Sequence, residues 1–357
     1  MDVYYIIFFI VFIFCFFDFV TLRQFRNFIY YLLCAGIILF VGFRKIGIDN
    51  DSGMYEYMYY FFYKATWTEI WKGGAGYVEI GYMALNKIFH SVFSEFRFFL
   101  FFIALSTGVL NYSYFLKKTS FPFLVLLGYV SFFFLYRDFT QIRYALSAAI
   151  CFWCVDAFID KKYYKCLFLF LLAVCFHNAA FILVPVLPFV KSFKHNLLLI
   201  LLPIPSFLIG YSVNLFPLLL STGLANEHME LYKNEEGGAG YALSVIGYLF
   251  VLIYMLLKNF VKKIEFTEKE NFIFRIVALS ISLNFLFIQS AIFQRFTYIL
   301  FQFALILMSI LLEKALRYTE RKESFILLYF ILSVFLLSYG IRMVDVTLVR
   351  PYEIGMK

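Results

Sequence analysis

The residues of this sequence that could do chemistry are charged side chains that interrupt long apolar stretches. The main group begins at Arg137 with Arg-Asp-Phe-Thr-Gln-Ile-Arg, continues through an apolar stretch, a lysine-rich turn and a second apolar stretch, and ends at Phe176-His177-Asn178. A charge in such surroundings has to be held by a partner, a water-filled cavity or a ligand. We therefore interpret the segment from Arg137 to His177 as a functional site.

Three arginines, Arg44, Arg143 and Arg295, stand at the ends of apolar stretches. The planar guanidinium fork matches the oxygens of a diphosphate, whose charge would compensate that of the arginine. The alternative for each arginine is a side chain that extends to the lipid headgroups. The predicted substrate-binding set is Arg44, Asp49, Arg137, Gln141, Arg143, Arg295 and Tyr298.

The candidates for a general base are His177, Asp51 and Glu79. His177 alone among the four histidines is bracketed by long apolar runs. Such a histidine is either a buried hydrogen-bond partner or, with arginines and carboxylates nearby, a base. The sequence leaves open which of the three residues takes the proton.

No pattern for a metal or a cofactor occurs in this sequence. The histidines lack ligand spacing, and there is no phosphate-binding glycine loop, nucleophile elbow or dinucleotide fingerprint. All six cysteines fall inside apolar stretches, where a thiol behaves as a small hydrophobe. We expect neither metal nor cofactor, so the energy for a reaction has to come with the substrate.

The composition is that of a polytopic membrane protein. Of 357 residues, 63% are hydrophobic and 51 are Phe, and the mean hydropathy is +0.84. Apolar stretches of about 16 to 20 residues fit helices that cross a bilayer. We predict an all-α fold and one transmembrane domain over residues 1–357, with a retained first helix and about 12 transmembrane or partly inserted helices. The predicted stretches are 3–20, 28–43, 98–116, 121–136, 140–159, 164–176, 178–190, 196–212, 241–258, 271–288, 296–313 and 325–341, with 77–93 as an interfacial or partly inserted helix.

The distribution of Lys and Arg sets the orientation of these helices. Most basic residues are collected on the cytoplasmic face when the short basic turns are placed there. Both termini, the loops 44–76 and 213–240, the segment from Arg137 to Arg143 and the turn at His177 then lie on the periplasmic face. The net charge of +8 is explained by these turns, and no basic stripe indicates nucleic-acid binding.

Five short motifs occur in order along this sequence. They are Arg44, Gly47, Asp49, Asp51 and Tyr55; Glu79, Gly81 and Tyr82; Ile142, Arg143, Leu146 and Ser147; Lys161, Lys162, Phe176 and His177; and Arg295 with Tyr298. Together they resemble the EpsG family of Wzy-type polysaccharide polymerases, and the resemblance covers roughly residues 40 to 300. In the first motif, residues 47–51 read Gly-Ile-Asp-Asn-Asp where the family usually has Gly-Thr-Asp-Tyr, so either Asp49 or Asp51 is the family aspartate.

The resemblance implies a GT-C-like fold and a multi-pass protein of the bacterial inner membrane. Such polymerases transfer a growing glycan from undecaprenyl diphosphate onto the terminal sugar of another lipid-linked repeat unit, with inversion, at the periplasmic face. The product would be O-antigen or exopolysaccharide. The implied partners are the undecaprenyl-diphosphate-linked oligosaccharide, membrane lipids, and flippase and chain-length regulator proteins.

Two other readings share the membrane topology. A flippase or another transporter would place charges through the midplane and show related halves, whereas here the charges gather on one face and no repeat is visible. An O-antigen ligase or membrane acyltransferase is the second. The ligase pattern places its key histidine in a large late loop, and the loop 213–240 has only His228.

Overall fold

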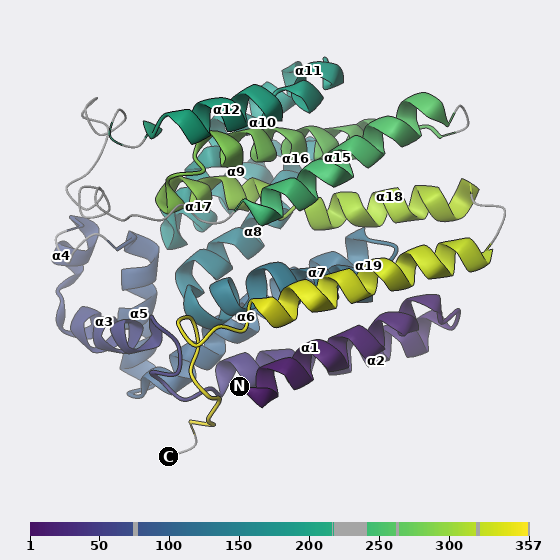
Figure 1. The fold of residues 1–357 in the computed structure, drawn as a ribbon. Coiled ribbons are helices and arrows are strands. Elements are labelled where there is room, and N and C mark those ends of the chain that lie inside the picture. Colours follow the sequence, from purple (N-terminus) through teal and green to yellow (C-terminus); the bar gives the residue numbers. More distant parts are fainter. Residues whose placement is uncertain (74–77, 216, 218–240, 262–263, 319–321, 356–357) are drawn as a thin grey trace. The chain divides into compact units, whose positions relative to one another are not determined.

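The computed structural model is all-helical, which confirms the predicted fold class. It describes residues 1–73, 78–215, 217, 241–261, 264–318 and 322–355, and these contain no β-strand (Figure 1). In the described residues, eight helices are long and apolar enough to cross a membrane, and three shorter apolar helices accompany them. The eight are Asp2–Phe19, Arg23–Gly42, Phe96–Lys118, Pro122–Thr140, Ile142–Ile159, Ala242–Asn259, Ala291–Tyr318 and Lys322–Arg342; the shorter ones are Tyr163–Phe176, Asn178–Ser192 and Asn196–Ser212.

Each of the twelve predicted apolar stretches coincides with a helix, but twelve membrane spans are not confirmed. The stretch 271–288 forms α16 (Glu268–Leu286), which does not qualify as an apolar span in the described chain. Its buried residues include the polar Asn271, Arg275 and Asn284. A helix surrounded by protein can carry such groups because neighbouring side chains satisfy them.

The chain forms two compact units, and the first comprises Met1–Asp156, Tyr163–Asn178 and Thr319–Lys357. The prediction of a single transmembrane domain stays a prediction. The helices of this unit are α1 (Asp2–Phe14), η1 (Cys15–Phe19), α2 (Arg23–Gly42), α3 (Ser52–Lys64), α4 (Trp67–Trp71), α5 (Ile80–Val92), α6 (Phe96–Lys118), α7 (Pro122–Tyr129), the π-helical η2 (Val130–Thr140), α8 (Ile142–Ile159), α9 (Tyr163–Phe176) and α19 (Lys322–Arg342).

Packing within the first unit joins helices that are distant in the sequence. Helix α2 lies along α6, and α1 lies between α7 and α19. Asp18, at the end of the first span, accepts hydrogen bonds from the amides of Phe123 and Leu124 and from the Tyr329 hydroxyl. Its carboxylate thereby caps the amino end of α7, where free amides favour negative charge.

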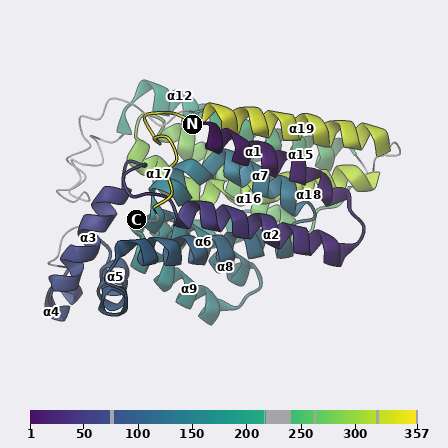
Figure 2. The ribbon, with the colours of Figure 1, turned by 90° about the horizontal axis from the view of Figure 1, so that it is seen from below.

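The short helices α3, α4 and α5 gather at one end of the first unit. Figures 1 and 2 both show them beyond the end of α2, near the two chain ends. Helix α5 packs against α3 and α9. The predicted helix 77–93 is thus present as α5, one of the helices outside the candidate spans. Within this unit, the segments that we predict to share one face of the membrane meet at this end. The side of the membrane that this end faces stays a prediction.

The second unit comprises Ala157–Lys162 and Ala179–Tyr318, and α16 is its central helix. Six neighbouring elements pack on α16, and they include short apolar helices that contain proline. The predicted loop 213–240 lies almost entirely outside the described residues, as do positions 74–76 of the predicted loop 44–76. The other elements are η3 (Asn178–Ile182), whose first residue belongs to the first unit, α10 (Leu183–Ser192), α11 (Asn196–Leu201), α12 (Pro203–Ser212), α15 (Ala242–Phe260), α17 (Ala291–Phe301) and α18 (Ala304–Tyr318).

Candidate active site

Arg44 and Asp49 form a buried ion pair in the loop that follows α2. The Arg44 Nε atom lies 2.9 Å from Asp49 Oδ2, and both side chains are 0% exposed. The two Nη atoms of Arg44 donate to the carbonyls of Val41, at 2.7 Å, and Phe139, at 2.5 Å. Gly47 has a φ of +89°, which lets the chain turn back between the partners. Protein groups therefore occupy all three nitrogens of Arg44, and its predicted diphosphate contact stays a prediction.

Asp49 also holds the beginning of α3. Its Oδ1 atom accepts hydrogen bonds from the amides of Asp51 and Ser52, at 3.0 and 2.7 Å. These amides would otherwise lack partners at the amino end of the helix. Asp51 is the N-cap residue of α3 and is half-buried, one turn before Tyr55. Of the two aspartates, Asp49 has the structural position and Asp51 the more accessible one.

Arg143 and Glu79 form a second ion pair at the same end of the first unit. The Arg143 Nη1 atom donates to Glu79 Oε2, and the side chains are 14% and 7% exposed. Glu79 is the N-cap residue of α5, and its Oε1 atom accepts from the amide of Asn178 at 3.1 Å. The Arg143 Nε atom has no hydrogen-bond partner among the described residues. Arg143 is thus held on one side and retains a donor that protein groups leave unused.

Two tyrosines surround the guanidinium of Arg143. The Arg143 Cζ atom lies 5.9 Å from the ring centre of Tyr55 and 5.5 Å from that of Tyr82. Burial raises the pKa of the Tyr55 hydroxyl to about 12 although the positive charge of Arg143 opposes it, and burial raises that of Tyr82 as well. Both hydroxyls are neutral near pH 7. They offer aromatic faces and polar atoms without adding charge.

His177 follows α9 directly and lies close to the Arg143–Glu79 pair. Its ring centre is 5.1 Å from that of Tyr144, the residue after Arg143, and the rings meet edge to face at 71°. Its chain neighbour Asn178 is the residue whose amide binds Glu79. At the contact of α5 with α9, a Cβ atom on Gly81 would lie 2.5 Å from the Cys175 Cβ atom, so only glycine permits this approach. The structure therefore brings Asp51, Glu79, Arg143 and His177 together at one end of the unit.

Arg137 and Asp138 lie in the π-helical η2 and are buried. Arg137 is 1% exposed, with its Cζ atom 4.0 Å from the ring centre of Phe133 and 5.0 Å from that of Tyr144. Asp138 accepts a hydrogen bond from the Tyr129 hydroxyl at 2.6 Å. In this conformation Arg137 offers almost no surface to a ligand, and its predicted role in substrate binding stays a prediction. Gln141, between η2 and α8, is half-buried.

Arg295 and Tyr298 belong to the second unit and lie on α17. Arg295 is half-buried and Tyr298 is 8% exposed. Their predicted contact with a diphosphate stays a prediction. Among the described residues, no group of three or more His, Cys, Asp or Glu side chains is placed to hold a metal ion.

Tyr55 and Tyr82, which flank Arg143, are named in the family motifs but are absent from the predicted site residues. Each lies three or four positions after a predicted acid, Tyr55 after Asp51 and Tyr82 after Glu79, which is one helical turn. That spacing is the signal that could have identified them. The sequence contains 28 tyrosines, so the signal alone is weak.

Comparison with known proteins agrees with the motif pattern. The EpsG family is matched over residues 27–354. The chain is also similar to the amylovoran biosynthesis protein AmsC of Erwinia amylovora, with 24% identity over 205 residues. The alignment covers 53% of each chain, so this chain spans about half the length of the curated relative that it matches. No solved structure gives a significant match.

Proposed function

Since this chain belongs to the EpsG family, we propose that it is a polysaccharide polymerase of the bacterial inner membrane. It would act as an inverting glycosyltransferase that joins undecaprenyl-diphosphate-linked repeat units at the periplasmic face. The curated relative is named for the biosynthesis of amylovoran. Family and relative together support a role in polysaccharide biosynthesis, and the site supports the finer assignment.

The observation that carries the proposal is the position of Arg143. Its guanidinium lies at the beginning of a candidate membrane span, is 14% exposed, and is paired with Glu79. A lipid-linked diphosphate presents its charge at this depth, where a polyprenyl chain enters the hydrocarbon layer. A guanidinium in a partly dry place binds such an anion strongly because little water competes for either charge.

The reaction needs one bond formed and one broken. The acceptor hydroxyl oxygen attacks the anomeric carbon of the donor sugar, and the bond from that carbon to the diphosphate oxygen breaks. The electron pair of that bond leaves with undecaprenyl diphosphate, whose developing charge Arg143 stabilises. The hydroxyl proton passes to a base, and attack opposite the leaving group inverts the configuration.

We assign the base to His177 and a positioning role to Glu79. Both Glu79 oxygens are engaged, one by Arg143 and one by the amide of Asn178, the residue after His177, so the carboxylate holds the guanidinium in place. An imidazole is a side chain suited to accept a proton as a general base. Asp51, half-buried at the N-cap of α3, is the alternative base.

The glycan pattern of a deletion strain tests the proposal. Without this protein, lipid-linked single repeats would still be made and exported, so the surface glycan should collapse to one repeat unit, and the wild-type gene should restore the full ladder. Loss of all surface glycan would instead support a flippase or a ligase. A polymerase would further be expected to work beside a flippase and a chain-length regulator, which crosslinking in the native membrane would detect.

A further inference from the structure

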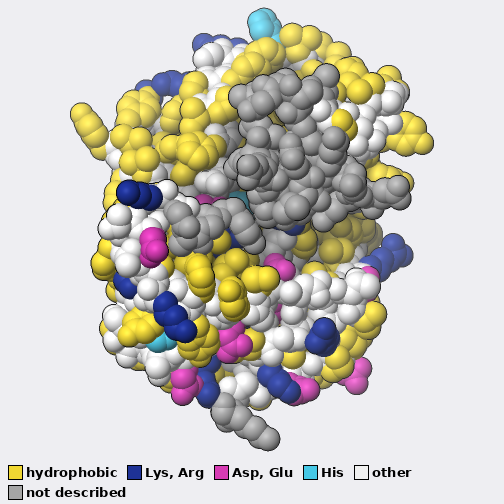
Figure 3. All heavy atoms as spheres, turned by 90° about the vertical axis from the view of Figure 1, so that its left-hand side faces the viewer, with side chains coloured by type: hydrophobic (Ala, Val, Ile, Leu, Met, Phe, Trp, Pro, Cys, Tyr) yellow, Lys and Arg dark blue, Asp and Glu magenta, His cyan; other side chains and the backbone are white. Residues whose placement is uncertain are grey.

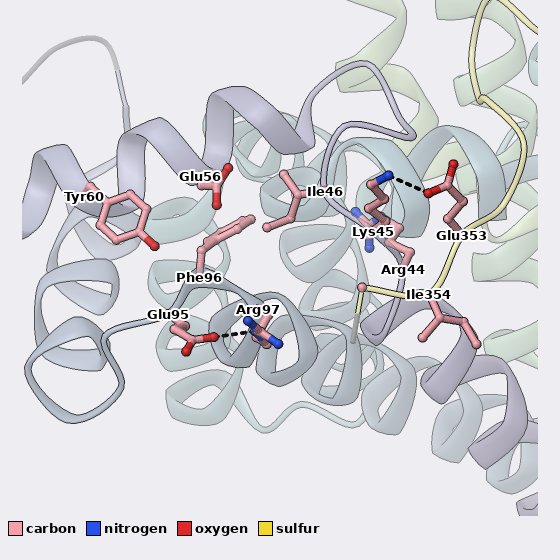
Figure 4. Close-up of a pocket in the computed structure, with 11 residues that line it drawn as sticks. Arg44, Lys45, Ile46, Glu56, Tyr60, Glu95, Phe96, Arg97, Glu353 and Ile354 are labelled. Atoms are coloured by element: carbon pink, nitrogen blue, oxygen red, sulfur yellow. Dashed lines mark hydrogen bonds and ion pairs between the residues drawn. The ribbon is translucent and has the colours of Figure 1, made fainter. Parts of the chain in front are cut away.

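A pocket of about 530 Å³ opens at the same end of the first unit and is bordered by α3. It lies between α3, the beginning of α6, the loop after α2 and the segment 353–355, as Figure 4 shows. Its volume falls within the roughly 300 to 1,000 Å³ of small-molecule sites. The polar residues that line it include Lys45, Glu56, Tyr60, Glu95, Arg97 and Glu353.

The charges around the pocket nearly cancel. Lys45 pairs with Glu353 and Arg97 pairs with Glu95, each at 2.5 Å. Arg44 also borders the pocket, but its guanidinium is 0% exposed against Asp49 and adds no positive charge to the opening. Glu56 makes no ion pair among the described residues. The pocket therefore carries a small negative excess, which disfavours an anionic ligand and suits a neutral or cationic one.

The walls combine an aromatic face with hydrogen-bonding groups. Tyr60 is 41% exposed, and its ring is braced by Tyr59 and His90, with ring centres 5.7 and 5.6 Å away. In Figure 4, Glu56 and Tyr60 extend from α3 on one side of the pocket, and Phe96 lies on the other. A sugar ring has C–H groups on its faces and hydroxyls around its edge. An aromatic ring beside a carboxylate matches both parts of that surface, whereas a lipid chain would leave the polar groups unsatisfied.

Helix α3 connects this pocket to the Arg143 cluster. Tyr55 faces the guanidinium of Arg143, and the next residue, Glu56, lines the pocket. Consecutive Cα atoms are about 3.8 Å apart, so one turn of α3 borders both places. A substrate with a diphosphate at Arg143 could thus place sugars near Glu56 and Tyr60. On the face in Figure 3, acidic and basic side chains of the described residues are interspersed.

We propose that this pocket binds sugar residues of the lipid-linked substrate and prefers neutral or amine-bearing sugars over uronic acids. The assignment rests on the proposed function for the identity of the substrate. Tyr60 supplies the stacking face and Glu56 accepts hydrogen bonds from hydroxyl or ammonium groups. In this arrangement Arg143 binds the diphosphate, and Glu56 and Tyr60 bind the glycan.

Saturation-transfer difference NMR on the full chain in lipid nanodiscs tests this assignment without requiring catalysis. The probes are methyl glucoside, methyl glucosaminide and methyl glucuronide, which differ in charge on one ring. We expect the first two to bind and the glucuronide to bind more weakly. Tyr60→Ala should weaken the binding of both roughly threefold to tenfold. Glu56→Gln should weaken the glucosaminide roughly twofold to fivefold and the glucoside less.

The matched control is Tyr57→Ala, on the same helix, because Tyr57 is 64% exposed and does not line the pocket. It should bind as the wild type does, and a thermal unfolding curve of each variant excludes misfolding. Absent binding of the glucoside and the glucosaminide, equal binding of the glucuronide, or an equal loss in Tyr57→Ala would overturn the assignment. The glycosides could bind with these variant effects while the wild-type gene fails to restore the glycan ladder of the deletion strain. That result would uphold the pocket and refute the polymerase. If the wild-type protein restores the ladder but Tyr60→Ala binds the glycosides as well as the wild type does, the polymerase is upheld and the pocket assignment is refuted.

Discussion

The carboxylate of Glu79, at the first turn of α5, binds the guanidinium of Arg143, which lies 64 positions further along the chain at the beginning of α8. The pair fixes a short helix outside the candidate spans to the end of a buried one. Neither charge lies in open water, because Tyr55 and Tyr82 flank the guanidinium.

Replacement of Arg143 tests the diphosphate contact. Arg143→Ala should abolish polymerisation in a protein that still inserts, since a partly dry phosphate contact is worth several kcal/mol and each ~1.4 kcal/mol is tenfold in rate. Arg143→Lys should restore little, because a point charge cannot reproduce the guanidinium fork. The glycan ladder of the complemented deletion strain, at matched expression, measures both. A full ladder from Arg143→Ala would remove this residue from the site.

Glu79 should act through Arg143. Glu79→Gln keeps the shape of the side chain and removes its charge, and we expect polymerisation in isolated membranes to fall roughly tenfold to a hundredfold, as for other residues that orient a functional group. The double variant Arg143→Lys with Glu79→Gln should be no worse than Arg143→Lys alone, which is expected to keep a small measurable activity. Additive losses would show that Glu79 has its own role, for instance as the base.

The general base is tested by two substitutions at His177. His177→Ala and His177→Gln should both lose polymerisation, because an amide preserves a hydrogen bond but cannot take the proton. Asn178→Ala is the matched control, since the contact of Asn178 with Glu79 uses the backbone amide and its side chain is exposed. Substantial activity in His177→Gln would transfer the role of base to Asp51.

Arg44 should matter for stability before it matters for catalysis. Arg44→Ala leaves the buried Asp49 carboxylate without its partner, which typically costs about 3 to 5 kcal/mol. We expect a large fall in the temperature at which the detergent-solubilised protein loses its monodisperse peak in size-exclusion chromatography. The double variant Arg44→Met with Asp49→Leu should recover part of that loss. A heat-stable but inactive Arg44→Ala would favour the predicted contact with substrate instead.

The orientation of the chain in the membrane is tested with single cysteines. Five native cysteines are buried and Cys175 is exposed, so the background is Cys175→Ser. Met54→Cys on α3, where the side chain is 54% exposed, should react with an impermeant thiol reagent in spheroplasts. Lys162→Cys in the turn after α8 should react only after lysis. The opposite pattern would place the Arg143 cluster in the cytoplasm.

The helices could be predicted from the sequence because length and hydropathy are local properties. The helix α16 was predicted as well, but its status as a membrane span is not confirmed. Its buried Arg275 is satisfied by Asn196 and Glu268, and the sequence does not show which neighbours surround a helix. The carboxylate cap of Asp18 on α7 joins residues 105 positions apart, so no local pattern indicates it.

The candidate site could be predicted only in part, because the sequence does not show which groups surround a side chain in the fold. Arg44 and Arg143 look alike in the sequence, since each is an arginine at the end of an apolar stretch. The structure separates them by their surroundings. Arg44 is saturated by Asp49 and two carbonyls, while Arg143 retains one nitrogen without a protein partner among the described residues. Which donors keep no protein partner depends on tertiary packing, which residue type and spacing do not encode.

The loop from Arg44 to Asp49 is joined to the segment 349–355. Isolated β-bridges pair Arg44 with Ile354 and Asp49 with Val349, and Lys45 binds Glu353 across 308 positions of sequence. At about 5 to 20 residues per second, the ribosome makes the second partner roughly 15 to 60 s after the first. During that interval the loop keeps its turn through contacts with earlier parts of the chain, among them the ion pair of Arg44 with Asp49, five residues apart. A nascent protein therefore has its pocket wall incomplete until segment 349–355 emerges, which would postpone sugar binding until the membrane helices before it have been synthesised.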